Sequence, residues 1–247
     1  MPATPAWPPK SLPRLFVRQT LSAGAGVELD KGQANYLGNV LRLGPGAELL
    51  VFDGLSGEWL ARIAALEKRR MTLVVERLVR EAESVPDVWL AFAPVKRAQT
   101  DWLVEKATEL GVARLIPILT QRTIAERVKL ERLRTNAIEA SEQCGRTRVP
   151  EISEPMPLKR FIEELDPDRH FYFADEGGGK AAPQSFAEGP AVILVGPEGG
   201  FTDEERAFVR GSGASAISLG PRILRAETAA LAAVSVFMAV AGDWRTY

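Results

Sequence analysis

Short hydrophobic runs separated by turn residues occupy the first third of the chain. The runs are rich in Leu, Val and Ile, and Asp53-Gly54 is a turn signal between two of them, so they predict strands. The expected strands are one that begins at Arg14, then Glu48–Phe52, Glu58–Leu66 and Met71–Val79, with a further turn at Lys68-Arg69-Arg70. Asp30 to Leu43 predicts a short helix that Gly44-Pro-Gly46 ends. Closely spaced strands of this kind predict a small β-barrel or sandwich over residues 12–80.

From Val88 onward, hydrophobic runs alternate with segments of helical periodicity, after a charged stretch at 81–87 that predicts a linker. The expected strands are Val88–Ala93, Arg114–Leu119, His170–Ala174, Val192–Val195 and Ala216–Leu219. The expected helices are one that ends at Gly111, then Arg127–Gly145, Pro157–Leu165, Asp203–Val209 and Ala226–Gly242. Strands that alternate with helices predict an α/β domain over 88–247, with a parallel sheet covered on both faces.

The last predicted helix is apolar nearly all round, with Leu231, Val234, Phe237 and Met238 among alanines. A helix without a polar face has to be buried on more than one side. In a domain of this size the pattern favours a subunit interface over a central helix, so we expect a homodimer.

The composition excludes several classes of chemistry. Cys144 is the only cysteine and His170 the only histidine, so we expect no disulfide framework, no metal site and no His-based triad. Prolines in the N-terminal MPATPAWPPK do not fit a signal peptide. The longest apolar run, Ala229–Ala241, is too short to span a bilayer. We therefore expect a cytoplasmic protein without a membrane anchor, whose chemistry uses carboxylates, Lys, Arg, backbone dipoles or a borrowed cofactor.

The net charge of −1 hides an asymmetry along the chain. Residues 1–80 hold 11 Lys and Arg against 7 Asp and Glu, whereas the remainder holds 20 against 25. A basic first segment suits contact with an anionic polymer such as nucleic acid. Scattered, solvated charge is the alternative, and composition alone leaves it open.

Two stretches share one order of features: Val192–Glu205 and Leu219–Ala230. Each has an apolar run, a Gly-Pro break, a short charged loop and a helix start. The glycines of the first loop allow a ligand to approach the backbone, and Thr202 with Glu205 forms a capping-box pattern. Loops at the ends of buried strands are where open α/β sheets bind ligands. Two loops of this kind favour a binding site over ordinary β–α turns.

Charged residues in and near these loops are candidate functional groups. Arg222 and Arg225 precede the last helix, where positive charge opposes the helix dipole, so an anionic partner becomes plausible there. Glu198 can cap a helix or accept hydrogen bonds from a ligand. Lys96-Arg97 follows a strand end, a suitable place for phosphate contact, although a solvated pair is equally compatible with the pattern.

Five motifs, in chain order, resemble the RsmE family of small-subunit (16S) ribosomal RNA uracil-N(3) methyltransferases, which belongs to the SPOUT superfamily. They are Val40-Leu-Arg-Leu-Gly-Pro-Gly46, Glu105-Lys-Ala-Thr-Glu-Leu-Gly111, Glu142-Gln-Cys-Gly-Arg146, Gly196-Pro-Glu-Gly-Gly200 and Leu219-Gly-Pro-Arg-Ile-Leu-Arg-Ala-Glu-Thr228. One departure is visible, because Asn35-Tyr36 stands where the family usually carries histidine before its Val-Leu-Arg segment.

The resemblance implies a PUA-like β-barrel that binds RNA, followed by a SPOUT α/β domain whose C-terminal part is tied in a trefoil knot. It also implies a homodimer and S-adenosylmethionine held between the two Gly-Pro loops. The cofactor residues it implies are Leu194, Val195, Gly196, Pro197, Glu198, Gly199, Gly200, Leu219, Gly220, Arg222 and Leu224. The expected RNA-binding residues are Arg14, Arg18, Arg42, Lys96, Arg97 and Arg146.

A sulfonium methyl donor leaves the protein to supply binding, alignment and electrostatics. We hypothesise that Arg225 stabilises negative charge developing on the uracil carbonyls, and that Glu227 or Glu198 takes the proton of ring nitrogen 3. Two alternatives stay open. One is a SPOUT enzyme that acts on a ribose hydroxyl or a tRNA base, and the other is a non-catalytic RNA-binding assembly factor with the same fold.

Overall fold

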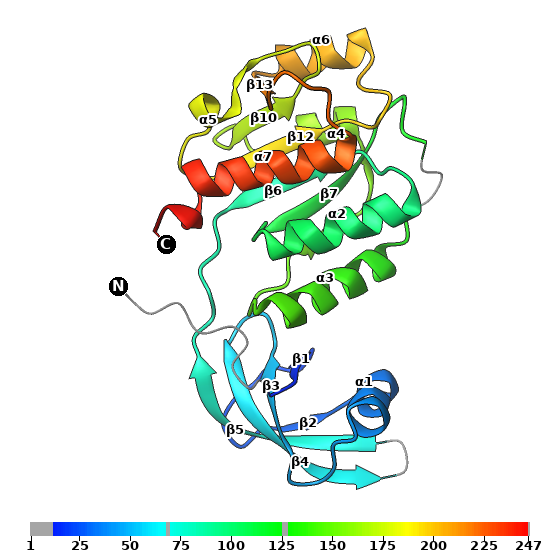
Figure 1. Ribbon diagram of the computed structural model, residues 1–247, viewed down its shortest axis with the longest axis vertical. Coiled ribbons are helices and arrows are strands. Elements are labelled where there is room, and N and C mark those ends of the chain that lie inside the picture. The colour runs from blue at the N-terminus through cyan, green and yellow to red at the C-terminus, as the bar shows by residue number, and fades with distance from the viewer. Residues whose placement is uncertain (1–11, 68–69, 125–127, 247) are drawn as a thin grey trace. The chain divides into compact units, whose positions relative to one another are not determined.

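The structure is a computed structural model that describes residues 12–67, 70–124 and 128–246 (Figure 1). It divides into two compact units. The first unit contains the described residues up to Glu83 together with Glu142–Arg148, and the second contains Ser84–Ser141 and the chain from Val149 onward. The sequence did not predict that 142–148 joins the first unit. The predicted turn residues 68–69 and the predicted helix start at 127 lie outside the described residues.

The first unit is built on a five-stranded sheet of order β1-β3-β4-β5-β2. Its strands are β1 Arg14–Phe16, β2 Gly26–Glu28, β3 Glu48–Phe52, β4 Glu58–Glu67 and β5 Arg70–Arg80. β1 pairs with β3 in parallel and the other neighbours are antiparallel. Alternate residues of β3 and β5, such as Leu49, Val51 and Leu73, form its core. The predicted strands are therefore confirmed, and β2 is an addition.

The helix predicted from Asp30 to Leu43 is shorter than expected. Asp30 caps α1 (Lys31–Asn35) in a reciprocal capping box with Gln33, and a π-helical segment, η1 (Tyr36–Val40), continues it. The chain then leaves the helix through Arg42 at φ 57°, the left-handed region usually reserved for glycine. The reversal at Arg42 comes before the Gly44-Pro-Gly46 turn and ends the helix early.

The second unit is a parallel sheet of order β11-β13-β10-β12-β6-β7-β8, with β9 also paired to β7. All its strand pairs are parallel, as predicted. The strands are β6 Val88–Phe92, β7 Arg114–Leu119, β8 Glu151–Ile152, β9 Met156–Pro157, β10 His170–Ala174, β11 Lys180–Ala181, β12 Ala191–Val195 and β13 Ser215–Ser218. The short strands β8, β9 and β11 carry too few residues to leave a pattern in the sequence.

Helices cover both faces of this sheet (Figure 1). Leu90 and Ile193 pack with one set of helices, whereas Ala91 and Leu194, their chain neighbours, pack with the other. The first set is α2 Arg97–Glu109, α3 Leu130–Cys144, α5 Ala182–Ser185 and α7 Ala226–Val240, and the second is α4 Leu158–Glu163 and α6 Asp203–Gly211. A strand buried on both faces reads as an unbroken apolar run, which explains β12.

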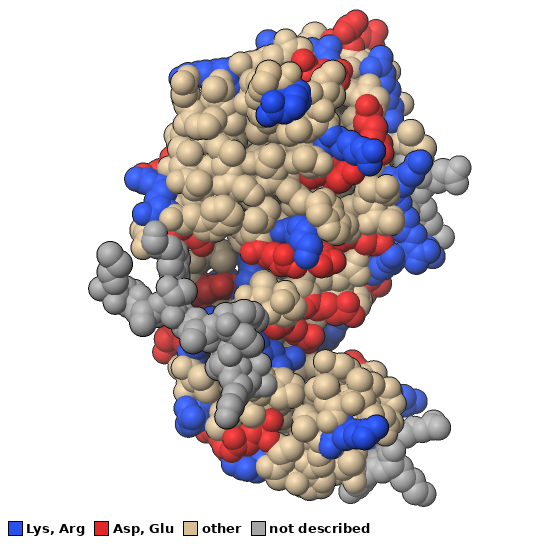
Figure 2. Space-filling model, in the orientation of Figure 1, with Lys and Arg blue, Asp and Glu red and all other residues tan. Residues whose placement is uncertain are grey.

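Helix α7 is the apolar element predicted at the end of the chain. Ala230, Ala233, Val234, Phe237 and Met238 are buried in the core of the second unit. Together with the 3-10 turn η2 (Asp243–Thr246) it forms a 21-residue segment that is long and apolar enough to cross a membrane by length and composition alone, with an 18-residue window of mean hydropathy 1.4 that is 44% buried. A core helix passes the same test. Figure 2 shows a surface without Lys, Arg, Asp or Glu over most of α7.

Candidate functional site

A cavity of about 410 Å³ opens at the carboxyl ends of β10, β12 and β13. Both predicted loops, the one after β12 and the one after β13, line it. Parallel strands end at the same edge of a sheet, so loops that are 20 or more residues apart in the chain meet there. The wall residues are Ala174, Asp175, Glu176, Gly178, Val195, Gly196, Pro197, Glu198, Gly200, Phe201, Ile217, Ser218, Leu219, Gly220, Pro221, Arg222, Ile223, Leu224, Arg225, Ala226 and Ala229.

The residues implied to hold the cofactor all line this cavity except Leu194 and Gly199. Leu194 points into the core beneath α4 and α6, because successive residues of a strand face opposite sides. Gly199 lies against the side chain of Arg122, and its carbonyl accepts a hydrogen bond from Arg122 Nη1 at 2.7 Å. Leu194 therefore supports the sheet and Gly199 supports the loop, and a role of either residue in cofactor binding stays a prediction.

At two glycines of the first loop, an added Cβ would crowd a neighbouring side chain. Gly200 has φ 66°, and a Cβ built there would lie 2.4 Å from Glu176 Oε1. A Cβ on Gly196 would lie 3.0 Å from the ring of Phe201. These glycines let the backbone itself form part of the wall, which exposes peptide groups to a ligand.

The candidate catalytic residues differ in their access to the cavity. Arg225 and Glu198 are exposed and line it, and Arg225 is the N-cap residue of α7 without a side-chain capping hydrogen bond among the described residues. Glu227 is buried at 8% exposure and does not line it. Its Oε2 is buried and has no hydrogen-bond partner in the described part of the chain. At the second loop, the Arg225 guanidinium is therefore accessible to a ligand, whereas the Glu227 carboxylate is buried.

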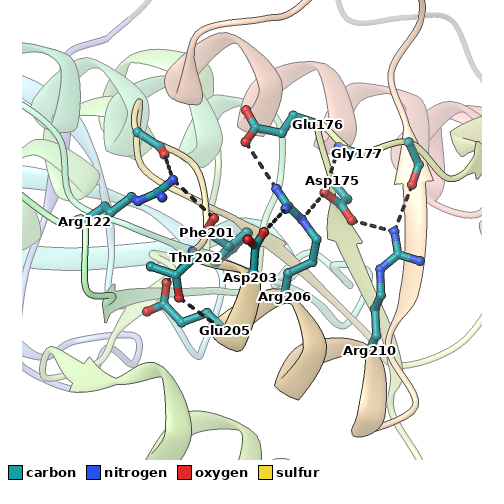
Figure 3. Close-up of polar contacts among 12 residues, drawn as sticks. Arg122, Asp175, Glu176, Gly177, Phe201, Thr202, Asp203, Glu205, Arg206 and Arg210 are labelled. Carbon is teal, nitrogen blue, oxygen red and sulfur yellow. Dashed lines mark hydrogen bonds and ion pairs between the residues drawn. The ribbon is translucent and has the colours of Figure 1, made fainter.

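The segment after β10 forms a third wall of the cavity, which the sequence did not predict. The Asp175 side chain is 0% exposed and binds two arginines of α6: Oδ1 accepts from Arg206 Nε at 2.9 Å, and Oδ2 from Arg210 Nη2 at 2.6 Å (Figure 3). The Gly177 amide also donates to Oδ1 at 2.9 Å. Burial alone would raise the pKa of Asp175, but these hydrogen bonds and the Arg206 charge outweigh it and hold the pKa below its ordinary value.

The loop between β7 and α3 braces the first loop (Figure 3). Arg122 donates to the carbonyl of Gly199, and the amide of Gln121 donates to Glu205 Oε1 at 2.8 Å. Glu205 also completes the predicted capping box, since its Oε2 accepts from the Thr202 amide at 3.0 Å and its own amide donates to Thr202 Oγ1. One carboxylate therefore fixes the start of α6 and ties two loops together.

Two of the residues expected to bind RNA make internal contacts within the first unit. Arg14 is 8% exposed, pairs with Glu58 at 2.6 Å, and donates at 2.7 Å to the carbonyls of Glu142 and Arg146. The Arg146 guanidinium is buried beside Glu83. Both guanidiniums thus tie segment 142–148 to the rest of the first unit, which gives them a structural role, and their contact with RNA stays a prediction. Arg18, Arg42, Lys96 and Arg97 are exposed.

Comparison with known proteins fits both units. A family model described as an RNA methyltransferase PUA domain matches residues 29–76, and one described as an RNA methyltransferase domain matches residues 82–238. The ribosomal RNA small subunit methyltransferase E of Rickettsia conorii is 30% identical over 229 residues, which cover 90% of this chain and 93% of that protein. The chain belongs to the ribosomal RNA small subunit methyltransferase E family. The family member from Synechocystis is 33% identical over 231 residues, covering 90% of this chain and 76% of that one.

Solved structures of the methyltransferase E family and of a related protein share the fold over nearly the whole chain. The family member from Neisseria gonorrhoeae, bound to S-adenosylmethionine, has a TM-score of 0.88 at 28% identity and covers 94% of this chain and 99% of its own. A methyltransferase of Legionella pneumophila in complex with the same cofactor has a TM-score of 0.86 at 31% identity, with the same coverage. Among the described residues of this chain, no cluster of three or more His, Cys, Asp or Glu is arranged to hold a metal ion.

Proposed function

We propose that the protein transfers the methyl group of S-adenosylmethionine to ring nitrogen 3 of one uridine in the 16S RNA of the small ribosomal subunit. The observation that carries the proposal is the single cavity lined by both Gly-Pro loops, in a chain of the methyltransferase E family. The names of its relatives support ribosomal RNA as the acceptor, and the resemblance of the five motifs supports the uridine nitrogen.

The cavity suits the cofactor. Its volume of about 410 Å³ lies in the range of small-molecule sites, about 300–1,000 Å³. Val195, Ile217 and Leu219 offer an apolar wall for an adenine ring, while Gly196 and Gly200 offer backbone groups for its polar edge and for the ribose. When bound, S-adenosylmethionine supplies a methyl group on a positively charged sulfur.

The residues of the chain would then handle a proton and a negative charge. Ring nitrogen 3 of uridine has to lose its proton as the new nitrogen–carbon bond forms. Glu198 is the favoured acceptor because its carboxylate is exposed at the cavity, whereas that of Glu227 is buried. Arg225 stands at the same cavity and can stabilise charge on the uracil carbonyls. Proton transfer of this kind contributes roughly 10²–10⁴ in rate and alignment about 7–11 kcal/mol, so positioning is the larger contribution.

The remaining features of the proposal follow the same resemblance. Residues 12–80 form a PUA-like β-barrel, 81–87 a linker and 88–247 a SPOUT domain whose loops at 196–200 and 219–225 are threaded in a trefoil knot. Two loops around one cavity support that threading. The uncharged surface over α7 supports a homodimer (Figure 2). A ribosomal RNA substrate supports a cytoplasmic location. Arg18, Arg42, Lys96 and Arg97 are the exposed cations offered to RNA.

Mass spectrometry of ribosomal RNA from cells lacking the protein tests the proposal. We expect one 3-methyluridine to disappear from 16S RNA and to return with the wild-type chain. Calorimetry with S-adenosylmethionine completes the test: a chain that bound none would be an assembly factor. Loss of a methyl group from a ribose or from tRNA would show a different acceptor.

The variant Arg225→Ala tests the charge-stabilising role separately from cofactor binding. We expect it to bind S-adenosylmethionine with wild-type affinity in calorimetry and to lose at least tenfold in turnover on unmodified small subunits, since one charged hydrogen bond is worth about 1.5–3 kcal/mol. Full turnover by this variant would refute the role.

A further inference from the structure

A second cavity, of about 310 Å³, lies in the second unit between the N-terminal ends of α2 and α3. We call it the α2–α3 pocket. The family comparison and the cofactor chemistry leave it without a role. Its described walls come from the end of β6, the first turn of α2, Ile124, and Val128 and Lys129 with the first turn of α3. The wall residues are Pro94, Val95, Lys96, Arg97, Thr100, Asp101, Ile124, Val128, Lys129, Arg132 and Leu133.

The α2–α3 pocket stands at the same edge of the sheet as the cofactor cavity. Strands β12, β6 and β7 are neighbours in the sheet, so the loops at their carboxyl ends lie next to one another. The amide of Ala93, one residue before the pocket begins, donates to the carbonyl of Val195 at 2.9 Å. Arg122 bonds the loop of the cofactor cavity, and Ile124, two residues later, lines the pocket. A strand of RNA whose base reached the cofactor could therefore continue across this pocket.

The walls of the α2–α3 pocket are strongly basic. Among the described wall residues, Lys96, Arg97, Lys129 and Arg132 face one carboxylate, that of Asp101. Figure 2 shows Lys and Arg side chains gathered over these helix ends. Asp101 pairs with Arg132 Nη2, but Arg132 Nη1 is buried and has no hydrogen-bond partner in the described part of the chain. The Arg132 side chain as a whole is 34% exposed, so its guanidinium can also meet the oxygens of a bound anion.

The start of α2 also favours an anion. Lys96 is its N-cap residue and makes no side-chain capping hydrogen bond among the described residues, and the first turn carries no acidic side chain. Thr100, which could otherwise serve the helix end, is turned to the amide and carbonyl of Val95. The positive charges of Lys96 and Arg97 at the N-terminal end of α2 are unfavourable beside the helix dipole, and a bound anion would offset this cost.

The third property of the pocket is an apolar wall beside the charge. Ile124 is 71% exposed, and Val128 and Leu133 line the pocket next to it. A nucleotide presents the same combination, since its phosphate is anionic and its ribose and base have apolar faces. We propose that the α2–α3 pocket holds a phosphodiester of the acceptor RNA strand, next to the nucleotide that reaches the cofactor. The inference rests on the proposed function, because it assigns the position of the substrate of that same reaction.

The double variant Lys96→Ala/Arg97→Ala tests the pocket, and Lys159→Ala/Arg160→Ala is its matched control. The control removes the same Lys-Arg dipeptide from α4, where both side chains are exposed on the opposite face of the sheet. The affinity for small ribosomal subunits from cells lacking the protein is measured with each variant between about 50 and 200 mM salt. Calorimetry with S-adenosylmethionine and thermal unfolding show whether each variant is folded and loaded.

We expect the pocket variant to lose at least tenfold in affinity for the subunit, because a charge-assisted contact is worth about 1.5–3 kcal/mol. The slope of log affinity against log salt should become shallower by about 1.4, corresponding to two phosphate contacts with a single strand. Cofactor affinity and the control variant should remain unchanged. Lys129→Ala, just before the facing helix, should lose about tenfold in affinity, less than the double variant, with half the change in slope.

Equal RNA affinities for the pocket variant and the control would overturn the assignment. So would a tenfold loss that leaves the salt slope unchanged, since no phosphate contact would then have been removed. A wild-type chain that bound no S-adenosylmethionine would overturn the proposed function instead, and the paired RNA affinities would still decide whether the α2–α3 pocket binds RNA. Inorganic phosphate that bound at this pocket without competing with the subunit would also contradict the assignment.

Discussion

The loop after β10 depends on one buried carboxylate, which makes Asp175→Asn the sharpest perturbation of the cofactor cavity. Asp175 accepts from Arg206, Arg210 and the amide of Gly177. Asparagine keeps an oxygen for Arg206 and the amide but turns an NH₂ group toward Arg210 Nη2. The substitution thus removes one charged hydrogen bond, places two donors face to face and takes the buried counter-ion from two arginines. Arg206 keeps its pairs with Glu176 and Asp203.

The magnitude follows from the burial of the three partners. Breaking a buried ion pair costs about 3–5 kcal/mol. Here Asp175 is fully buried, but the side chains of Arg206 and Arg210 are 23% and 49% exposed, so water recovers part of the loss. We expect the free energy of unfolding to fall by about 2–3 kcal/mol. For a unit of this size that corresponds to a Tm lowered by about 5–10 °C. Cofactor affinity should weaken as well, because Asp175 and Glu176 form part of the cavity wall.

Thermal unfolding followed by circular dichroism measures the effect, and Asp203→Asn is its control. Asp203 pairs with the same Arg206 at 3.2 Å, but its side chain is fully exposed, so we expect no measurable change in Tm. Calorimetry with S-adenosylmethionine on both variants separates damage to the cavity from general loss of charge on α6. Equal Tm values for the two variants would refute the reasoning, because burial would then not distinguish the two carboxylates.

Three further predictions concern the same cavity. Because the fold lowers the pKa of Asp175 below 3.8, its stabilisation is complete above about pH 4 and is lost as pH falls through the folded-state pKa. The unfolding free energies of wild type and Asp175→Asn in urea should converge only below that pH, and a difference that grew on acidification would contradict this. Gly200→Ala should lower the free energy of unfolding by about 1–2 kcal/mol, because of its φ of 66° and the contact with Glu176, and should weaken cofactor binding. Gly211→Ala, whose added Cβ would meet open space, should leave Tm unchanged or raise it. Arg122→Ala should weaken cofactor binding in calorimetry by several-fold, because the loop loses the hydrogen bond to the Gly199 carbonyl. The control Arg134→Ala, in an exposed ion pair on α3, should bind the cofactor like the wild type. Equal cofactor affinities for the two variants would show that Arg122 does not support the loop.

The sequence determined the architecture because its signals are local. Strand β12 is buried on both faces, so its apolar run is unbroken. Thr202 and Glu205 stand at the spacing of a capping box, and they cap α6 as predicted. The two Gly-Pro loops share one order of features, which was enough to join them into one site. The motifs that resemble the methyltransferase E family are also local, and the family comparison agrees with them.

Only the tertiary structure decided what each charged side chain does, because its partners are distant in the chain. Asp175 meets its arginines 31 and 35 residues later, and Arg14 reaches carbonyls 128 and 132 residues away. Nothing near Arg14 in the sequence separates it from Arg18, yet one is buried in an ion pair and the other is exposed. Glu198 and Glu227 differ in the same way. The free energy of a charged group depends on burial and on its counter-ion, and both are set by the packing of segments that the sequence does not bring together.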